Sequence, residues 1–174
     1  MSEFKSWVLI IVVAFALSFL MRFYVIQPYR VEMTSMLDTL HPNDLVLVDK
    51  VSYRLHTPNR GDVVVFFPPN DLKEKYIKRV IGLPGETVEI KDGKVYVNEK
   101  PLDEPYLNSP MQYDSGPIQV PEGHVFVMGD NRSVSLDSRS FGPIEISSIV
   151  GRALFVYFPF NRIENLNAYS GENP

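Results

Sequence analysis

The chain has 174 residues, of which 45% are hydrophobic and 22% are charged, so its composition excludes a disordered chain and indicates one domain with an appendage. The formal net charge of -4 gives no reason to expect a nucleic-acid partner. There is no cysteine, which excludes disulfides and thiolate zinc sites. The histidines His41, His56 and His124 lack metal-ligand spacing, so we expect neither a metal nor a cofactor.

Residues 6–21 form an uncharged apolar run near the N-terminus. As a helix this run covers roughly 24 Å, and residues 23–26 extend it toward the ~30 Å of a bilayer core if Arg22 reaches the interface. A cleaved signal peptide is the main alternative, because Ala14-Phe15-Ala16 fits a small-x-small cleavage pattern. That pattern lies inside the apolar run, whereas a cleavage site follows it. The sequence therefore predicts an uncleaved transmembrane anchor, with a buried soluble helix as the other alternative.

The charges around this run do not fix its orientation. Lys5 lies on one side, and Arg22 and Arg30 lie on the other, so the positive-inside count is close to a tie. Long domains are translocated largely regardless of flanking charge. An extracytoplasmic domain after the anchor is compatible with this pattern.

After Pro28 the pattern changes to alternating or short apolar runs, which are typical of strands. Asp92-Gly93 is a strong two-residue hairpin signal, and residues 101–121 are predicted to form a long surface loop. Aromatic residues gather at 66–68 and 155–160, where a core position and an exposed rim on a bilayer are both possible. Strands are predicted at 29–33, 45–50, 62–67, 74–81, 87–91, 94–98, 124–128 and 149–157.

These patterns predict a mainly β fold, in which one N-terminal transmembrane helix precedes a folded antiparallel sheet or barrel-like catalytic domain. Residues 1–27 are the predicted N-terminal stub and anchor. Residues 28–165 form the predicted β-rich domain, and residues 166–174 form a polar C-terminal tail.

Lys78 stands within the predicted strand at 74–81, where an apolar residue is more usual. Alternate side chains of a strand share a face, so Lys78 shares its face with Tyr76 and Val80, while Arg79 points the other way. Apolar neighbours disfavour a charged lysine, and a neutral lysine can act as a general base. A lysine that extends to water is the alternative reading of this segment alone.

Ser35 lies about ten residues beyond the apolar run, after a predicted strand and before a turn. No histidine stands in a triad context, so a serine nucleophile here needs another base, such as a neutral lysine. Residues 129–143 are rich in Asp, Asn, Arg and Ser, as a buried and fully hydrogen-bonded polar loop requires. A solvated loop of the same composition is the alternative.

Four segments closely resemble the conserved boxes of bacterial type I signal peptidases in order and spacing. The segments are Ser35-Met36, residues 60–66, residues 78–86, and Gly129-Asp130-Asn131-Arg132 with its continuation to 142. The resemblance covers about residues 6–160, and the short chain with one anchor is similar to the Gram-positive branch of that family.

The resemblance implies a membrane-bound serine endopeptidase that removes N-terminal signal peptides from exported precursors with a Ser/Lys dyad. Ser35 is then the nucleophile, Lys78 the general base and Ser135 the residue that orients the lysine. The backbone N–H of Ser35 contributes to the oxyanion hole. Structural ion pairs are implied for Asp130, Arg79, Asp137 and Arg139, and the substrate groove and oxyanion region for Met33, Thr34 and Met36.

The implied substrates are precursors with small residues at positions -1 and -3, bound as an extended strand. The implied location is the cell membrane, with a single pass, a cytoplasmic N-terminus, an extracytoplasmic catalytic domain and the lipid bilayer as a partner.

The first box departs from the family pattern at two positions. Met33 replaces the usual Gly or Ser, so it cannot donate the hydroxyl that some members place in the oxyanion hole. Asp38 replaces a proline, and its charge is expected to raise the pKa of the lysine.

Two competing functions follow from these observations. A catalytically impaired homologue would bind exported precursors without cleaving them. A self-cleaving repressor-type Ser/Lys protease is the other alternative, but such proteins are soluble and carry a DNA-binding module, which neither the anchor nor the charge supports.

Overall fold

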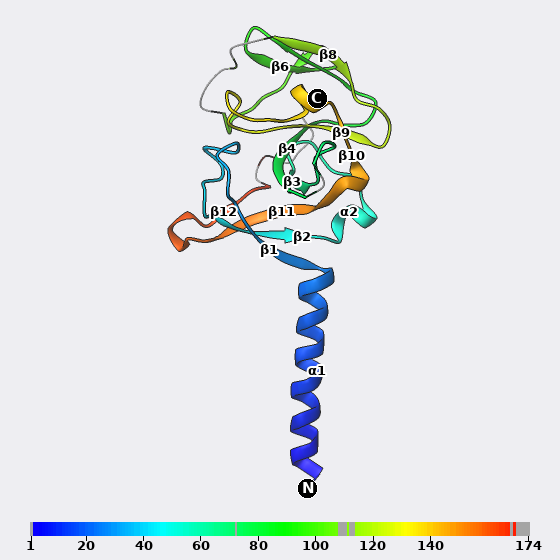
Figure 1. The fold of residues 1–174 in the computed structure, drawn as a ribbon, viewed down its shortest axis with the longest axis vertical. Coiled ribbons are helices and arrows are strands. Elements are labelled where there is room, and N and C mark those ends of the chain that lie inside the picture. Colours follow the sequence, from blue (N-terminus) through cyan, green and yellow to red (C-terminus); the bar gives the residue numbers. More distant parts are fainter. Residues whose placement is uncertain (1, 72, 108–110, 112–113, 168, 170–174) are drawn as a thin grey trace.

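The computed structural model describes residues 2–71, 73–107, 111, 114–167 and 169. Its first element, helix α1 (Ser2–Tyr24), extends away from the β-rich remainder of the chain (Figure 1). Apolar side chains on this helix are exposed, among them Phe4 at 75% and Trp7 at 64%. Within the described residues, no helix combines the length and the hydropathy needed to cross a membrane, so the predicted transmembrane span is not supported.

The larger sheet is antiparallel and positions most of the polar segments singled out in the sequence. Its central strand β11 (Ile149–Phe158) lies between β2 (Leu45–Asp49) and β3 (Val63–Phe66), and also pairs with β12 (Glu164–Asn165). Beyond β2 lies β1 (Ile26–Arg30). On the other side, β4 (Tyr76–Gly82), β9 (His124–Met128) and β10 (Ile144–Glu145) follow β3 in that order.

The smaller sheet has the order β7 (Lys100–Pro101), β6 (Lys94–Val97), β5 (Thr87–Lys91) and β8 (Ser115–Gln119). The hairpin at Asp92-Gly93 is confirmed, and both residues have positive φ, at 51° and 74°, as a tight two-residue turn requires. Strands β6 and β8 lie at the end of the molecule far from α1 (Figure 1).

Two predicted boundaries were wrong for a reason that proline chemistry explains. Strand β8 lies within 101–121, which the sequence indicated as loop, because Gly116 and Pro117 disguise an edge strand. Proline is tolerated at a sheet edge, where its missing N–H breaks no ladder. For the same reason Pro28 stands inside edge strand β1, which begins three residues before the predicted 29–33 and ends at Arg30. Residues 108–110 and 112–113 of the predicted loop lie outside the described residues.

Short helical turns connect the strands: α2 (Ser52–Leu55), α3 (Ser138–Phe141), η1 (Ile146–Ser148) and η2 (Phe160–Arg162). The carboxylate of Asp137 caps α3 by accepting a hydrogen bond from the backbone N–H of Arg139. This cap fixes the end of the polar loop before α3.

The two aromatic clusters of the sequence differ in how deeply they are buried. Phe66 is fully buried, so the core interpretation of 66–68 holds for this ring, whereas Phe155, Phe158 and Phe160 are 36%, 44% and 78% exposed. Leu166, within the predicted polar tail, is 2% exposed and packs in the core, and its N–H donates to the carbonyl of Leu154 at 3.0 Å. The chain therefore returns to the sheet after β12.

Candidate active site

Ser35 lies in a turn that begins a few residues after β1 ends. Ser35 is buried, with only 7% of its surface exposed. The backbone N–H of Asn131 donates to the Ser35 carbonyl at 3.0 Å, and the Asn131 amide donates to the Thr34 carbonyl at 3.2 Å. These contacts join the turn that carries the serine to the polar loop at 129–137.

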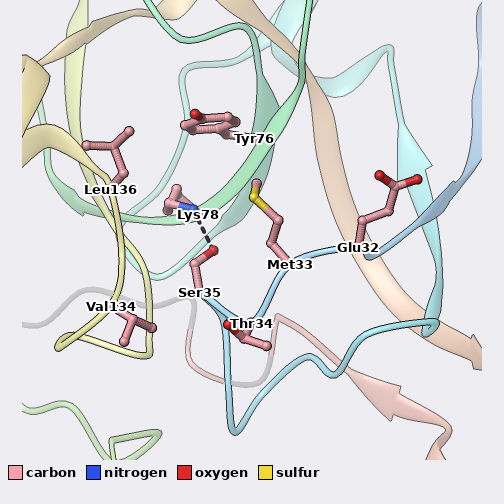
Figure 2. Close-up of a pocket in the computed structure, with 8 residues that line it drawn as sticks. All are labelled: Glu32, Met33, Thr34, Ser35, Tyr76, Lys78, Val134 and Leu136. Carbon is pink, nitrogen blue, oxygen red and sulfur yellow. Dashed lines mark hydrogen bonds between the residues drawn. The ribbon is translucent and has the colours of Figure 1, made fainter.

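Lys78 lies in the middle of β4, opposite Val64 of β3, and is 1% exposed. Its Nζ donates to Ser35 Oγ at 2.7 Å (Figure 2). It also donates to the Ile77 carbonyl at 3.1 Å. The ring of Tyr76, two residues earlier on the strand, has its centroid 5.2 Å from Nζ. The lysine is thus buried beside its strand neighbour rather than extended to water.

Burial lowers the pKa of Lys78 from 10.5 to about 8. The carboxylates of Asp137 and Asp130 oppose this fall, and the guanidinium of Arg139 adds to it. Asp38, which the sequence indicated as a charge acting on the lysine, is exposed, and the carboxylates that raise this pKa are the two in the polar loop. A pKa near 8 leaves a substantial neutral fraction able to accept a proton at mildly alkaline pH.

A cavity of about 290 Å³ opens over the Ser35–Lys78 pair. Met33 lies on one side of the pair, and Val134 and Leu136 of the polar loop lie on the other (Figure 2). The complete lining is Glu32, Met33, Thr34, Ser35, Tyr76, Lys78, Val134 and Leu136. Ser35 and Lys78 therefore both border an open cavity.

The three residues assigned to the groove do not all reach it. Met33 and Thr34 line the cavity, and Met33 is 41% exposed. Met36 is fully buried and packs in the core beneath the turn. A core side chain cannot touch substrate, so Met36 supports the turn instead of lining the groove.

The polar loop is built around the carboxylate of Asp137, which is fully buried. It accepts hydrogen bonds from the Gly129 N–H at 3.0 Å and from Arg139 Nε at 2.7 Å, the latter within an ion pair. Ser135 Oγ is buried and makes no hydrogen bond among the described residues. The contact with Lys78 that the resemblance implies is therefore not formed in this structure. The Ser135 hydroxyl still has a proton to donate and lone pairs to accept a hydrogen bond.

Arg79 points to the opposite face of β4 and is fully buried. Its guanidinium donates to both carboxylate oxygens of Asp130, from Nε at 2.9 Å and from Nη2 at 2.7 Å. Nη1 donates to the Gly61 carbonyl at 2.9 Å, and the Thr39 hydroxyl donates to Asp130 at 2.6 Å. This bidentate pair ties β4 to the first turn of the polar loop.

Sequence reasoning missed a second buried ion pair next to this one. Arg132 binds both oxygens of Glu104 and donates from Nε to the Gly129 carbonyl at 3.1 Å. The Tyr106 hydroxyl donates to Glu104 at 2.9 Å. The Gly-Asp-Asn-Arg run singled out Arg132, but no pattern in 101–121 marks Glu104 as its partner.

Gly129 offers a test of how tightly the loop is packed. A Cβ at this position would collide with Ser135 Oγ and with the Ser35 carbonyl oxygen, both held by the turn and the loop. Gly129→Ala is expected to lower activity by about 10²-fold through misplacement of Ser35, measured as kcat/KM on a precursor peptide. Gly123→Ala is the control for backbone strain without a collision: no described atom lies within 4 Å of its Cβ position, but its φ of 73° disfavours alanine, so it is expected to lose stability by about 1 kcal/mol and to keep its activity. Wild-type activity in Gly129→Ala would contradict the packing.

Comparison with known proteins agrees with this geometry. Residues 4–158 match the family model described as signal peptidase, peptidase S26. The chain is 43% identical over 173 residues to a probable signal peptidase I-1 of Synechocystis, covering 95% of this chain and 88% of that protein. It is 41% identical over 173 residues to signal peptidase I T of Bacillus subtilis, covering 93% and 89%.

A crystal structure of a signal peptidase I from Enterococcus faecalis is also similar, with a TM-score of 0.51 and 38% sequence identity. The alignment covers 56% of this chain and 97% of that chain. The fold is therefore mainly β with a curled antiparallel sheet, as in that signal peptidase I structure. The chain belongs to the signal peptidase family, peptidase S26, and is an enzyme of that family.

Proposed function

We propose that this protein is a serine endopeptidase that removes N-terminal signal peptides from exported precursors with a Ser35/Lys78 dyad. The observation that carries the proposal is the 2.7 Å contact between Lys78 Nζ and Ser35 Oγ at the floor of an open cavity. A lysine with a pKa of about 8 is matched to this task, since a general base works best near the operating pH.

In the proposed reaction, neutral Lys78 takes the proton of Ser35 Oγ as this oxygen attacks the scissile carbonyl carbon. The backbone N–H of Ser35 stabilises the oxyanion of the tetrahedral intermediate. The protonated lysine then gives its proton to the leaving amine, and the C–N bond breaks to leave an acyl ester on Ser35. Lys78 next accepts a proton from water as the water oxygen attacks the ester. The lysine returns this proton to Ser35 Oγ as the C–Oγ bond breaks, which releases the signal peptide as a carboxylic acid that ionises in water.

Ser135 is the proposed orienting residue for the lysine. Its buried hydroxyl lacks a hydrogen-bond partner among the described residues, and a buried hydroxyl without a partner is costly. It supplies the hydrogen bond to Nζ that the lysine needs once Ser35 turns toward substrate. Two ion pairs hold the turn, β4 and the loop in place around the lysine: Arg79 with Asp130, and Arg139 with Asp137.

The proposed substrates carry small residues at positions -1 and -3 and bind as an extended strand. The cavity supports this assignment because Met33, Val134 and Leu136 give it apolar walls that suit the uncharged side chains of such residues. Alternate residues of an extended peptide face the same wall, which explains why two positions separated by one residue are read together.

The direct test is cleavage of a purified precursor by the detergent-solubilised protein, followed by N-terminal sequencing of the product. Cleavage on the carboxyl side of the -1 residue is expected for the unaltered protein and is lost in Ser35→Ala. Absence of cleavage on several precursors would favour the alternative, a homologue that binds precursors without cleaving them.

Met33 is the residue that would impair catalysis in that alternative. It stands two residues before Ser35 at the cavity wall, where a serine would add a hydroxyl donor. Met33→Ser is expected to raise kcat by about 10²-fold if that hydroxyl joins the oxyanion hole, measured on the same precursor. Met33→Ala is the control that removes bulk without adding a donor. Equal rates for the Ser and Ala variants would show that bulk, not the missing donor, limits this enzyme.

We also propose that the exposed apolar surface of α1 associates with a lipid bilayer and holds the catalytic domain at the extracytoplasmic side of the cell membrane. The support is that large apolar side chains such as Phe4, Trp7 and Phe15 are exposed, because contact of such surfaces with water is unfavourable. Protease added to intact cells is expected to degrade the β-rich domain. Protection until the cells are permeabilised would contradict this placement.

A further inference from the structure

Tyr106 covers the guanidinium of Arg79. The centre of its ring lies 4.0 Å from Arg79 Cζ, well within the distance at which a cation is attracted to an aromatic face. The ring lies against the Arg79 guanidinium, which is bonded to Asp130 and has no exposed surface. The ring is thus part of the cover that keeps this ion pair from water.

The position of Tyr106 is fixed by the second buried ion pair. Its hydroxyl donates to Glu104 at 2.9 Å, and Glu104 is paired with Arg132. Arg132 in turn donates to the Gly129 carbonyl at 3.1 Å. The segment after β7 is therefore linked to the polar loop that carries Asp130, so the ring and the ion pair it covers are held by the same loop.

Tyr169 lies behind Tyr106. The two ring centres are 5.7 Å apart, and the Tyr169 ring is 5.9 Å from Arg79 Cζ. The chain reaches this place because Leu166 is anchored in the core and bonded to β11. Residues 166–174 were predicted to form a polar tail. Tyr169 of this segment instead packs near Arg79, the neighbour in sequence of the proposed base Lys78.

We propose that Tyr106, backed by Tyr169, is a positioning residue for the proposed peptidase reaction: it keeps water from the Arg79–Asp130 ion pair and so fixes the stretch of β4 that presents Lys78. This inference rests on the dyad assignment. The physical basis is the adjacency of Arg79 and Lys78, because a shift of the buried arginine displaces the peptide unit that it shares with the lysine.

The electrostatics at Lys78 give this role a measurable signature. Lys78 is faced by Asp137 and Arg139 from the loop and α3, by Asp130 from the start of the loop, and by Tyr76 from its own strand. Burial is the main cause of its lowered pKa, and Asp130 acts in the opposite direction. Water entering beside Arg79 weakens its pairing with Asp130. A less tightly paired Asp130 acts more strongly on Lys78 and raises the pKa of the lysine.

The test compares Tyr106→Leu, Tyr106→Phe and Tyr169→Leu in the full-length protein, with Tyr96→Leu on β6 as the matched control. Tyr106→Leu is expected to lower kcat about tenfold while KM changes by less than about threefold, since orientation and not binding is lost. Tyr106→Phe keeps the aromatic face but loses the hydrogen bond to Glu104, so its kcat is expected to lie between those of the wild type and of Tyr106→Leu. Tyr169→Leu is expected to change kcat in the same direction by a smaller factor.

A second readout does not depend on cleavage. NMR titration of the labelled Lys78 side chain is expected to give a midpoint near pH 8 in the wild type and a higher midpoint in Tyr106→Leu. Wild-type kcat and an unchanged midpoint in both leucine variants would overturn the proposal. If Tyr106→Leu does not fold, Tyr169→Leu decides, because Tyr169 is 43% exposed and tolerates replacement. A wild-type protein that never cleaves would refute the proposed function, whereas the titration would still test the positioning role.

Discussion

Replacing Lys78 by methionine is expected to lower kcat/KM for precursor cleavage by at least about 10⁴-fold, the scale seen when one member of a catalytic unit is removed. Methionine matches the length of the buried lysine stem but has no nitrogen to take the Ser35 proton. Nζ is the group hydrogen-bonded to Ser35 Oγ, so the serine then lacks a base. The measurement is the rate of appearance of mature protein from a purified precursor.

The same variant is expected to stay folded. Lys78 is 1% exposed, and replacing a buried amine by an apolar side chain of similar size removes a desolvation cost. Thermal unfolding checks this expectation, so a loss of activity can be separated from a loss of structure. Lys73→Met, at an exposed lysine five residues earlier, is the matched control and is expected to cleave normally. Activity of Lys78→Met within about tenfold of wild type would contradict the dyad.

Removing the carboxylate of Asp130 is expected to have the largest effect on stability. Asp130→Ala leaves Arg79, which has no exposed surface, without its bidentate partner. Breaking one side of a buried ion pair costs about 3–5 kcal/mol of the free energy of unfolding, because the remaining charge stays buried and uncompensated. Denaturant unfolding measures this loss, and Asp103→Ala, at an exposed carboxylate, is expected to change stability by less than about 0.5 kcal/mol.

A double variant separates this explanation from a simple loss of packing. Arg79→Met combined with Asp130→Ala removes the stranded charge, so it is expected to be more stable than Asp130→Ala alone. If the double variant is as unstable as the sum of the single variants, the two side chains do not act as a pair.

Local patterns in the sequence were sufficient to predict a strand at β4 and the faces of its middle residues, although the predicted range was 74–81 and the strand spans Tyr76–Gly82. Alternation along 76–80 placed Lys78 beside Tyr76 and put Arg79 on the other face, and the structure has the two basic side chains in separate buried environments. The meeting of Lys78 with Ser35, 43 residues away, did not follow from alternation. It followed only from the resemblance to a family, because the local pattern of neither segment shows that the two segments meet in the fold.

The parts that sequence reasoning missed share one physical cause. Glu104 and Tyr106 belong to a segment whose prolines and polar residues indicate a solvated loop, and their burial depends on a partner, Arg132, 28 residues away. Tyr169 looked like part of a polar tail because only Leu166 anchors that segment in the core. Apolar periodicity reports one face of one element, whereas Glu104 and Tyr106 are held by an ion pair and a hydrogen bond between distant segments.

Met36 differs from the two residues grouped with it. The resemblance implied the groove and oxyanion region for Met33, Thr34 and Met36, yet the side chain of Met36 packs in the core while Met33 and Thr34 line the cavity. Adjacent residues in a turn point in different directions, so proximity in sequence does not establish contact with substrate.

The central claim is that neutral Lys78 is the base, and the pH dependence of kcat/KM tests it most directly. Below its pKa of about 8 the amine is protonated and cannot accept the Ser35 proton, so activity is expected to rise with pH and to level off above a midpoint near 8. The measurement uses one precursor peptide over a range of about pH 6 to 10, within which the fold is checked by circular dichroism. A midpoint near 8 supports the lysine base, whereas a rate that is independent of pH across this range would contradict it.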